Sequence, residues 1–349
     1  MSPAGESALG RAAIRGARMR RLGRSIALAA LVLGVFGLLL LAFGKNPLRA
    51  YADVFAGTVG SGHGLSGTLV RMIPLVLAAL AVAVPGKIWL INVGGEGQLH
   101  AGALLATWGA LNLGHWPAWL LLPAMAALGF LGGGLWAGLA GVPRARGWVS
   151  ETISTLLLNY IAILLVSFVV FGPWKDPEGV NYPQTAEFSA AATLPALAGT
   201  RIHLGLVFAA AAVPLFAFVA ARTRWGLEMQ AIGGNLEAAR RAGLPIARYV
   251  VVLMVVGGGL AGLGGMAEVS AVHGRLRPSL SPGYGYTGFL ISWMAGGRPL
   301  PIVGAAFLLA VIAGGGDILQ MTQALPASAA NVLMAVVLFV VLARRAGAP

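Results

Sequence analysis

The sequence contains no cysteine and little charge. Without cysteine, disulfide bonds and thiolate metal sites are excluded, and nothing indicates the redox compartment. Charged residues account for 10% of the 349 positions, whereas soluble domains carry about 25%. Hydrophobic residues account for 58% and form several uninterrupted runs of about 18 residues or more, the length that spans a bilayer. The composition therefore predicts an all-α membrane protein that crosses the bilayer many times.

Motifs of nucleotide and metal chemistry are also absent. No G-x-x-x-x-G-K-[ST] occurs, and PGKIW at 85–89 lacks the leading glycine and the hydroxyl that would hold Mg²⁺. HExxH is absent, and no serine nucleophile is framed by a motif. The five histidines have no metal-ligand spacing: His63, His100, His115, His203 and His273. We therefore expect no enzyme active site, metal or cofactor in this chain.

A membrane-length window predicts ten spans with both termini in the cytosol. The spans are 25–44, 67–85, 96–113, 117–140, 151–172, 202–221, 249–271, 284–297, 300–316 and 328–344. The first run is longer than the apolar region of a signal peptide and is interpreted as a retained span. The predicted parts are a basic cytosolic arm at 1–24, one membrane domain at 25–344 and a cytosolic tail at 345–349.

The predicted element at 284–297 is too short to cross a bilayer, and prolines and glycines flank it. We expect a broken or re-entrant helix, which must be covered by protein or line a water-filled cavity. Residues 67–113 and 249–297 both run from an apolar helix through a glycine-rich polar stretch to a second apolar stretch. This pattern favours an internal, inverted repeat.

The net charge of +13 follows the predicted topology. Fifteen of the 24 basic residues fall in four segments on one side of a ten-span arrangement, as the positive-inside rule predicts for the cytosol. They are Arg11, Arg15, Arg18, Arg20, Arg21, Arg24, Arg144, Arg146, Arg222, Arg224, Arg240, Arg241, Arg248, Arg344 and Arg345. Nucleic-acid binding would need these charges on one face with aromatics for stacking, and neither pattern occurs. Residues 45–66 and 173–199 are expected as outer loops.

Glycine clusters indicate closely packed helices. GGGLAGLGG at 257–265 and GGG at 132–134, followed by Gly138 and Gly141, allow helix backbones to approach, as interfaces inside membranes favour.

INVGGEGQLHAG (91–102) places polar residues among glycines. Asn92, Glu96 and His100 recur at i, i+4 and i+8, so they share a face if the stretch is helical, and Gln98 lies beside them. An ionisable residue inside a membrane is costly and faces a cavity or a partner. These residues are candidates for a pathway or its gate. The alternative is structural, with Glu96 capping a helix or pairing with Lys87.

SETISTLLLNYIA (150–162) carries a second polar stripe. Glu151, Thr155 and Asn159 lie at i, i+4 and i+8, so a carboxylate, a hydroxyl and an amide share one face. The stripe either lines a pathway or joins helices by hydrogen bonds, with Glu151 stabilised near a helix N-terminus.

WGLEMQAIGGNLEAARRAGLPIARY (225–249) predicts a short ordered helix in the most basic loop. Asn235 is a good N-cap, 236–242 is helical, Gly243 is a C-cap and Pro245 ends the helix. These residues at the start and end of the helix favour an element that docks on a partner protein. The alternative is an amphipathic helix lying on anionic lipid.

NVGGEGQ (92–98), SETISTLLLNYIA (150–162) and GLEMQAIGGNLEAARRAGL (226–244) together resemble permease subunits of bacterial ABC importers of the simple-sugar and nucleoside type. The resemblance runs in order and spacing from about residue 45 to residue 344. EAARRAG (237–243) also resembles the EAA-x-x-x-G signature of importer permeases, whose helix enters a groove in the ATPase.

This resemblance implies a nucleoside permease in the bacterial cytoplasmic membrane, driven by ATP and Mg²⁺ on separate ATPase subunits. The implied partners are those ATPases, a second, similar but distinct permease, an extracytoplasmic substrate-binding lipoprotein and the lipid bilayer. Candidates for the pathway or its gate are Asn92, Glu96, Gln98, Glu151, Thr155, Asn159, Tyr284 and Tyr286. Candidates for ATPase coupling are Asn235, Glu237, Ala238, Ala239, Arg240, Arg241 and Gly243.

Two other functions stay open. One is a simple-sugar importer of the same branch. The other is an ion-coupled secondary transporter with ion sites at Glu96, Glu151, Glu268 and Asp317, which would not need an ordered docking helix. The two candidate tyrosines either stack on a base or ribose or anchor the chain at the membrane surface.

Overall fold

The computed structural model describes residues 30–179, 182–197, 199–326 and 328–346, together with Gly23, Ala27 and Leu28. The predicted basic arm and tail lie largely outside these residues. The chain forms two compact units. The larger unit is Thr58–Gly314, and the smaller is made from the two ends of the chain, up to Gly57 and from Gly315.

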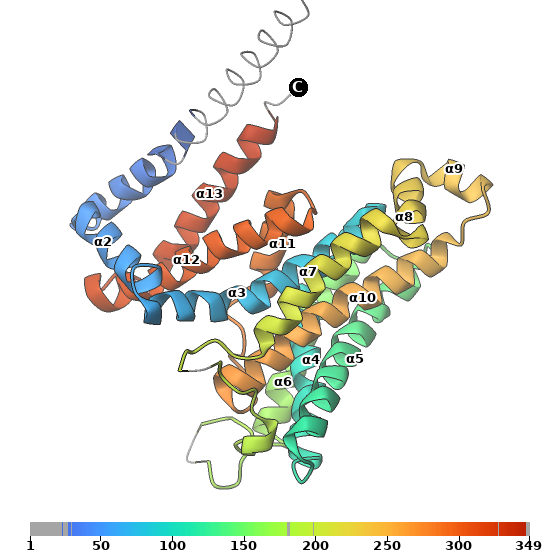
Figure 1. The fold of residues 1–349 in the computed structure, drawn as a ribbon, viewed down its shortest axis with the longest axis horizontal. Helices are drawn as coiled ribbons and strands as arrows, with labels where there is room; N and C mark the ends of the chain where they lie inside the picture. Colours follow the sequence, from blue (N-terminus) through green and yellow to red (C-terminus); the bar gives the residue numbers. More distant parts are fainter. Residues whose placement is uncertain are drawn as a thin grey trace, which may run out of the picture. The chain divides into compact units, whose positions relative to one another are not determined.

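Regular structure in the described part of the chain is helical (Figure 1). The larger unit contains α3 (Gly62–Ala83), η1 (Pro85–Ile88), α4 (Gly95–Asn112), α5 (Ala118–Ala145), α6 (Glu151–Phe171), η2 (Ala190–Ala192), α7 (Gly205–Arg222), α8 (Arg224–Gly234), α9 (Leu236–Arg241), α10 (Ile246–Ala267), η3 (Glu268–His273) and α11 (Tyr284–Ala295). Helix α12 (Pro299–Gln323) continues from the larger unit into the smaller one. The smaller unit also holds a helix at Ala30–Ala42, α2 (Pro47–Thr58) and α13 (Ser328–Ala346).

Six described helices are long and apolar enough to cross a membrane. They are Gly62–Gly86, Ala118–Ala145, Glu151–Phe171, Gly205–Arg222, Ile246–His273 and Pro299–Gln323. A seventh is added if Ala30–Ala42 and Pro47–Thr58, which meet at 115°, form one broken span. The structure thus confirms a helical protein with several spans, while ten spans and cytosolic termini stay predictions.

The smaller unit differs from the sequence-based expectation in one place. Residues 45–66 are predicted as a loop, but α2 occupies Pro47–Thr58. The turn before it gives the reason, because the Asn46 side chain accepts hydrogen bonds from the backbone nitrogens of Leu48 and Arg49 and so starts a new helix. A small core of Phe36, Leu40, Ala50, Leu319 and Leu325 joins α2 to its neighbours within this unit.

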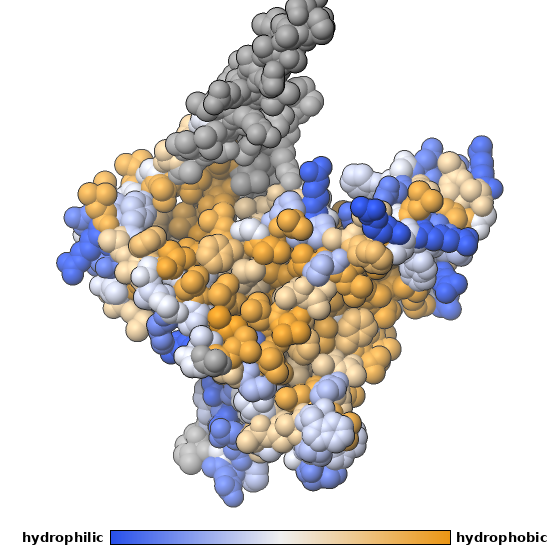
Figure 2. Space-filling model, in the orientation of Figure 1, coloured by the Kyte–Doolittle hydropathy of each residue, from blue (hydrophilic) through white to orange (hydrophobic). Residues whose placement is uncertain are grey.

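Glycine contacts hold the centre of the larger unit together, as the sequence predicts. A Cβ added to Gly102 of α4 would lie 2.2 Å from the Cα of Gly262 in α10. One added to Gly133 of α5 would lie 2.2 Å from the carbonyl oxygen of Gly258. Three helices therefore touch through backbone, which only glycine permits. Figure 2 shows hydrophobic surface on this unit between a hydrophilic end at α8 and α9 and another at the 172–204 segment.

Two interrupted segments position the site. After α3 the chain passes through η1 and an irregular stretch at 90–93 before α4 begins; we call this interruption the first break. After α10 it passes through the π-helical turn η3 and an irregular stretch at 274–283 before α11 begins. The first residues of α4 and α11 meet, because a Cβ on Gly95 would lie 3.3 Å from Gly285. The two segments correspond to the predicted repeat, and its inverted symmetry stays a prediction.

Candidate functional site

The polar stripe of α6 binds the irregular stretch before α4. Glu151 Oε1 accepts the Ile91 backbone N–H at 3.1 Å, and Thr155 Oγ1 accepts that of Val93 at 3.2 Å. Asn159 accepts the Gly97 N–H at 2.8 Å and donates to the carbonyl of Val93 at 2.9 Å. The three side chains thus provide partners for backbone groups that no helix satisfies. Non-helical backbone inside a membrane needs such partners.

Asn92 and Gln98 also stabilise the irregular stretch between η1 and α4. Their amides exchange two hydrogen bonds, at 2.9 and 3.0 Å, and Asn92 Oδ1 also accepts the Gly94 N–H at 3.0 Å. Asn92 Nδ2 donates to the carbonyl of Ala81 at 2.9 Å. The helical partner of that carbonyl would be the N–H of residue 85, which is a proline and has none. Asn92 therefore satisfies a carbonyl that the end of α3 leaves open.

Glu96 joins the two interrupted helices. Its Oε2 accepts the backbone N–H of Gly285, in the first turn of α11, at 2.7 Å. Glu96 itself stands in the first turn of α4, so two helix N-termini, which favour negative charge, face one carboxylate. His100 Nδ1 lies 2.8 Å from the Glu96 carbonyl, to which it donates, and 3.9 Å from the Glu96 carboxylate. Among the ion pairs of the described residues, Glu96 is paired with His100 and not with Lys87, whose ammonium lies 5.5 Å from the centre of the Phe216 ring.

The six polar candidates of α6 and the first break are buried, with at most 5% of each residue exposed. The contacts described above tie them to backbone and to one another. This geometry favours the structural interpretation that the sequence left open. Their role in transport stays a prediction, and so does that of Tyr286, which is 37% exposed.

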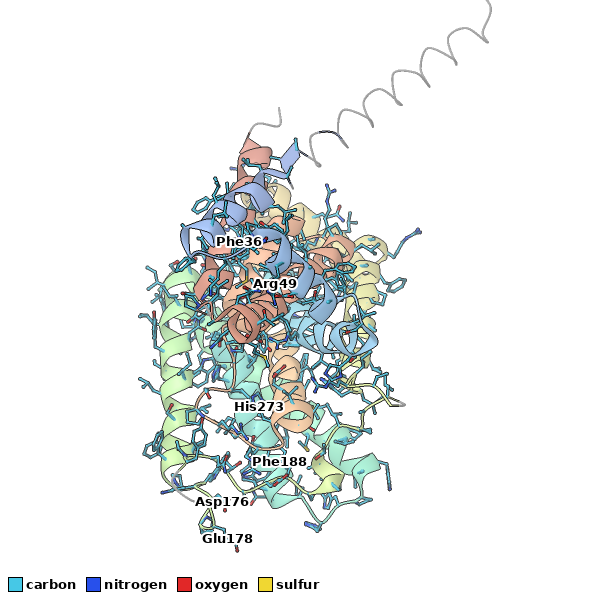
Figure 3. All side chains as sticks on the ribbon, turned by 90° about the vertical axis from the view of Figure 1, so that its left-hand side faces the viewer. Phe36, Arg49, Asp176, Glu178, Phe188 and His273 are labelled. Carbon is cyan, nitrogen blue, oxygen red and sulfur yellow. The ribbon has the colours of Figure 1, made fainter. Side chains whose placement is uncertain are left out.

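A cavity of about 780 Å³ lies beside η3 in the larger unit. Its lining includes Arg71, His203, Glu268, His273, Ser281 and Tyr284. Of the eight pathway candidates only Tyr284 is among its lining residues. In Figure 3, His273 lies toward the end of this unit that carries Asp176 and Glu178. We call this the η3 cavity.

Two titratable groups of the η3 cavity are almost fully buried. Glu268 is 2% exposed and His203 is 3% exposed. Burial lowers the pKa of His203 to about 4, so the ring is neutral at neutral pH. The Glu268 carboxylate lies 3.8 Å from His273 Nδ1, too far for a hydrogen bond. Sequence reasoning named Glu268 only as an ion site of a secondary transporter, and a carboxylate inside the apolar run at 249–271 was the signal for it.

The predicted short helix is confirmed as α9, and its docking role stays a prediction. The side chain of Asn235 caps it by accepting the Ala238 N–H at 3.0 Å. At its end, Gly243 has a φ of +76°, and the backbone nitrogens of Gly243 and Leu244 bond back to Arg240 and Ala239. Glycine at this left-handed position closes the helix as the sequence predicts.

Helix α8 fixes α9 to the rest of the unit. Glu228 of α8 accepts hydrogen bonds from the Tyr249 hydroxyl of α10 and from Arg224. The hydrogen bond from Tyr249, with that from Arg224, holds the pKa of Glu228 below its ordinary value. Trp89 Nε1 donates to the carbonyl of Gly233 at 2.6 Å, which ties α8 to the first break. Movement of α8 and α9 would therefore reach both α10 and the start of α4.

Comparison with known proteins identifies the family. Residues 64–342 match the family described as "Branched-chain amino acid transport system / permease component". The chain belongs to this family of permease components. It is 40% identical to the glucose ABC transporter permease protein TsgB13 of Haloferax volcanii, over 89% of this chain and 84% of that protein.

Two further relatives carry nucleoside names. The nucleoside ABC transporter permease protein NupB of Lactococcus lactis subsp. cremoris is 32% identical over 89% of each chain. The guanosine ABC transporter permease protein NupP of Bacillus subtilis is 27% identical over 90% of this chain and 92% of that protein. The expected simple-sugar and nucleoside type is therefore confirmed. The chain is an ABC transporter permease, a membrane transport component rather than an ATPase.

Proposed function

We propose that this chain forms the translocation pathway of an importer for nucleosides, with simple sugars as the alternative cargo. The relatives named for nucleosides and the resemblance of its three motifs support the first. The relative named for glucose, at 40% identity, supports the second. Both cargoes are neutral and carry a ring with several hydroxyl groups. Recognition of such a ring is common to both proposals.

The observation that supports ATP-driven transport is the α8–α9 element. A helix closed at both ends by its own caps keeps its shape when exposed, so it can enter a groove on a partner. Arg240 and Arg241 of this helix form ion pairs with the Glu237 carboxylate, with nitrogen–oxygen distances of 3.4 and 3.3 Å. An ATPase subunit is the partner that fits this element, and it supplies the ATP and Mg²⁺ chemistry that the sequence lacks.

The orientation follows from charge. Within the larger unit, Arg144 belongs to the last turn of α5, and this end of α5 packs on the early part of α10, because a Cβ on Gly141 would lie 3.7 Å from Val251. Asp176 and Glu178 lie at the opposite end of the unit (Figure 3). We place the arginine-rich end in the cytosol. The opposite end then faces an extracytoplasmic binding lipoprotein, in a bacterial cytoplasmic membrane. A second, similar but distinct permease completes the pathway.

The deciding experiment measures ATP hydrolysis. The chain is purified with its co-expressed neighbouring gene products in lipid nanodiscs, with and without binding protein loaded with uridine or with glucose. Stimulation by one loaded form supports the importer and selects the cargo. Transport by the purified chain alone, driven by an ion gradient in liposomes, would instead establish the secondary transporter.

A paired substitution tests the docking role. Gly243→Val forces a β-branched residue into left-handed backbone, which costs on the order of 1–2 kcal/mol or more, although no atom lies within 4 Å of the added Cβ. Gly234→Val is the control, because that position is equally open and its φ is not positive. We expect Gly243→Val to separate ATP hydrolysis from uptake while Gly234→Val leaves them coupled. Equal uptake in both variants contradicts the docking role.

A further inference from the structure

The η3 cavity contains a hydrogen-bond donor without an acceptor. His203 Nδ1 accepts the Gly205 backbone N–H at 3.1 Å, so that nitrogen carries no proton. The ring is therefore neutral and its proton lies on Nε2. Nε2 is buried and has no hydrogen-bond partner among the described residues. An unpaired buried donor is costly, so a ligand oxygen placed there would gain a hydrogen bond.

The same cavity also contains a hydrogen-bond acceptor, the Glu268 carboxylate. Glu268 is almost fully buried, and its carboxylate stays 3.8 Å from His273 Nδ1. That nitrogen lies 3.2 Å from the Glu268 carbonyl, to which it can donate. The carboxylate is thus suited to accept from hydroxyl groups of a ligand, and two neighbouring hydroxyls match its two oxygens.

The remaining lining fits an uncharged ring. Tyr284 offers an aromatic face, and its backbone N–H is already bonded to Ser281 Oγ at 2.9 Å, which fixes the start of α11 at the cavity wall. The lining carries charges of both signs, Arg71 and Arg201 against Glu268, so it offers both donors and acceptors to ring hydroxyl groups. The volume of about 780 Å³ is in the range of about 300–1,000 Å³ typical of small-molecule sites.

We infer that the η3 cavity binds the polyhydroxylated ring of the transported molecule, with His203 as donor, Glu268 as acceptor and Tyr284 as the stacking face. The inference rests on the proposed function and adds to it that one subunit alone holds a ring-specific site. A pentose and a hexose fit the same chemistry. A nucleoside would be held by its ribose, with the base outside the three contacts.

The absence of cysteine gives a clean assay. Ser279 lines the cavity and is exposed, so Ser279→Cys places one thiol at its mouth. Ser189→Cys is the control, because Ser189 is also exposed but does not line the cavity. The chain is placed in nanodiscs with its partner subunits, and modification of its thiol by a methanethiosulfonate reagent is timed by mass spectrometry. Glucose, ribose, uridine and uracil are added in turn at millimolar concentration.

We expect ribose, glucose and uridine to slow modification of Ser279→Cys and uracil to leave it unchanged, with no effect at Ser189→Cys. Adding His203→Asn keeps an acceptor near Gly205 but removes the Nε2 donor, and should raise the protecting concentration about tenfold. Glu268→Gln should raise it by a similar factor. His115→Asn, at an exposed histidine outside the cavity, should not.

Three outcomes would overturn the inference. They are absence of protection by any of the three ring compounds, protection by uracil equal to that by uridine, and protection that His203→Asn leaves unchanged. Each is separate from the proposed function, because ATP hydrolysis stimulated by loaded binding protein is measured on the same nanodiscs. If ATP hydrolysis is stimulated but no ring compound protects the thiol, the site is rejected and the importer function is supported. If ring compounds protect the thiol but hydrolysis is not stimulated, the site is supported and the importer function is rejected.

Discussion

Replacement of Glu96 tests whether the buried carboxylate is structural or belongs to the pathway. If it belongs to the pathway, Glu96→Gln abolishes transport and leaves assembly intact. The structure supports a different expectation, because Glu96 is 2% exposed and accepts the Gly285 N–H at 2.7 Å. Gln retains an acceptor oxygen for that bond, and Leu removes it.

The expected magnitudes differ for the two variants. A hydrogen bond to a charged group contributes about 1.5–3 kcal/mol and one to a neutral group about 0.5–1.5 kcal/mol. Loss of charge at two helix N-termini adds about 0.3–1 kcal/mol each, and relief from burying a charge offsets part of this. We therefore expect Glu96→Gln to cost about 1–2 kcal/mol. Glu96→Leu leaves the Gly285 N–H unpaired and costs about 1–3 kcal/mol more.

Tryptophan fluorescence on heating measures both variants in nanodiscs, and uptake is measured in liposomes. At a few degrees per kcal/mol, the melting temperature should fall in the order wild type, Gln, Leu, with Glu178→Gln at an exposed site as the unaffected control. Uptake by Glu96→Gln should fall only as far as the folded fraction falls. Unchanged melting together with abolished uptake in Glu96→Gln would refute the structural interpretation, and equal melting of Gln and Leu would show that the Gly285 bond contributes nothing.

Three further changes give distinct results. Gly285→Ala should prevent assembly, because its Cβ would lie 2.0 Å from the Glu96 nitrogen. Gly304→Ala is the control, because no atom lies within 4 Å of the added Cβ, and it should assemble normally. Copurification of the partner subunits measures assembly of both variants. Asn159→Leu should lower the melting temperature by several degrees, since it leaves the Gly97 N–H and the Val93 carbonyl without partners; a melting temperature equal to that of wild type would contradict this. The pKa of His203, lowered to about 4 from 6.5, means that the unfolded chain binds more protons between these values. The contribution of this residue to thermal stability should therefore fall as pH drops from about 6.5 toward 4. If the melting temperatures of wild type and His203→Asn changed equally with pH in that window, a buried neutral His203 would be refuted.

Local features of the fold could be predicted from the sequence, because their causes lie within a few residues. Asn235 and Gly243 close α9 at the expected positions, and both belong to the same short segment. The glycine clusters of α5 and α10 indicated close packing, since glycine has few other reasons to recur inside an apolar helix. The short element at 284–297 likewise proved to be a helix of 12 residues.

The partners of the polar residues could not be predicted. The stripe at Glu151–Asn159 was placed on one helix face, but what it binds is backbone about 60 residues away. Glu96 binds a backbone nitrogen 189 residues further along the chain. A single sequence shows which residues share a face and leaves open whether that face meets a cavity or a broken backbone. The η3 cavity was missed for a related reason, because His203 and Glu268 come from separate segments.

The geometry of the two breaks explains why an apolar chain retains a carboxylate at residue 96. Interrupting two helices inside a membrane exposes backbone groups that lipid cannot satisfy. Asn92, the stripe of α6 and Glu96 provide partners for those groups, and Glu96 also neutralises two facing helix ends. Polar residues at the breaks therefore form the scaffold. Ligand recognition is better sought where buried polar groups still lack partners, and His203 in the η3 cavity meets that condition.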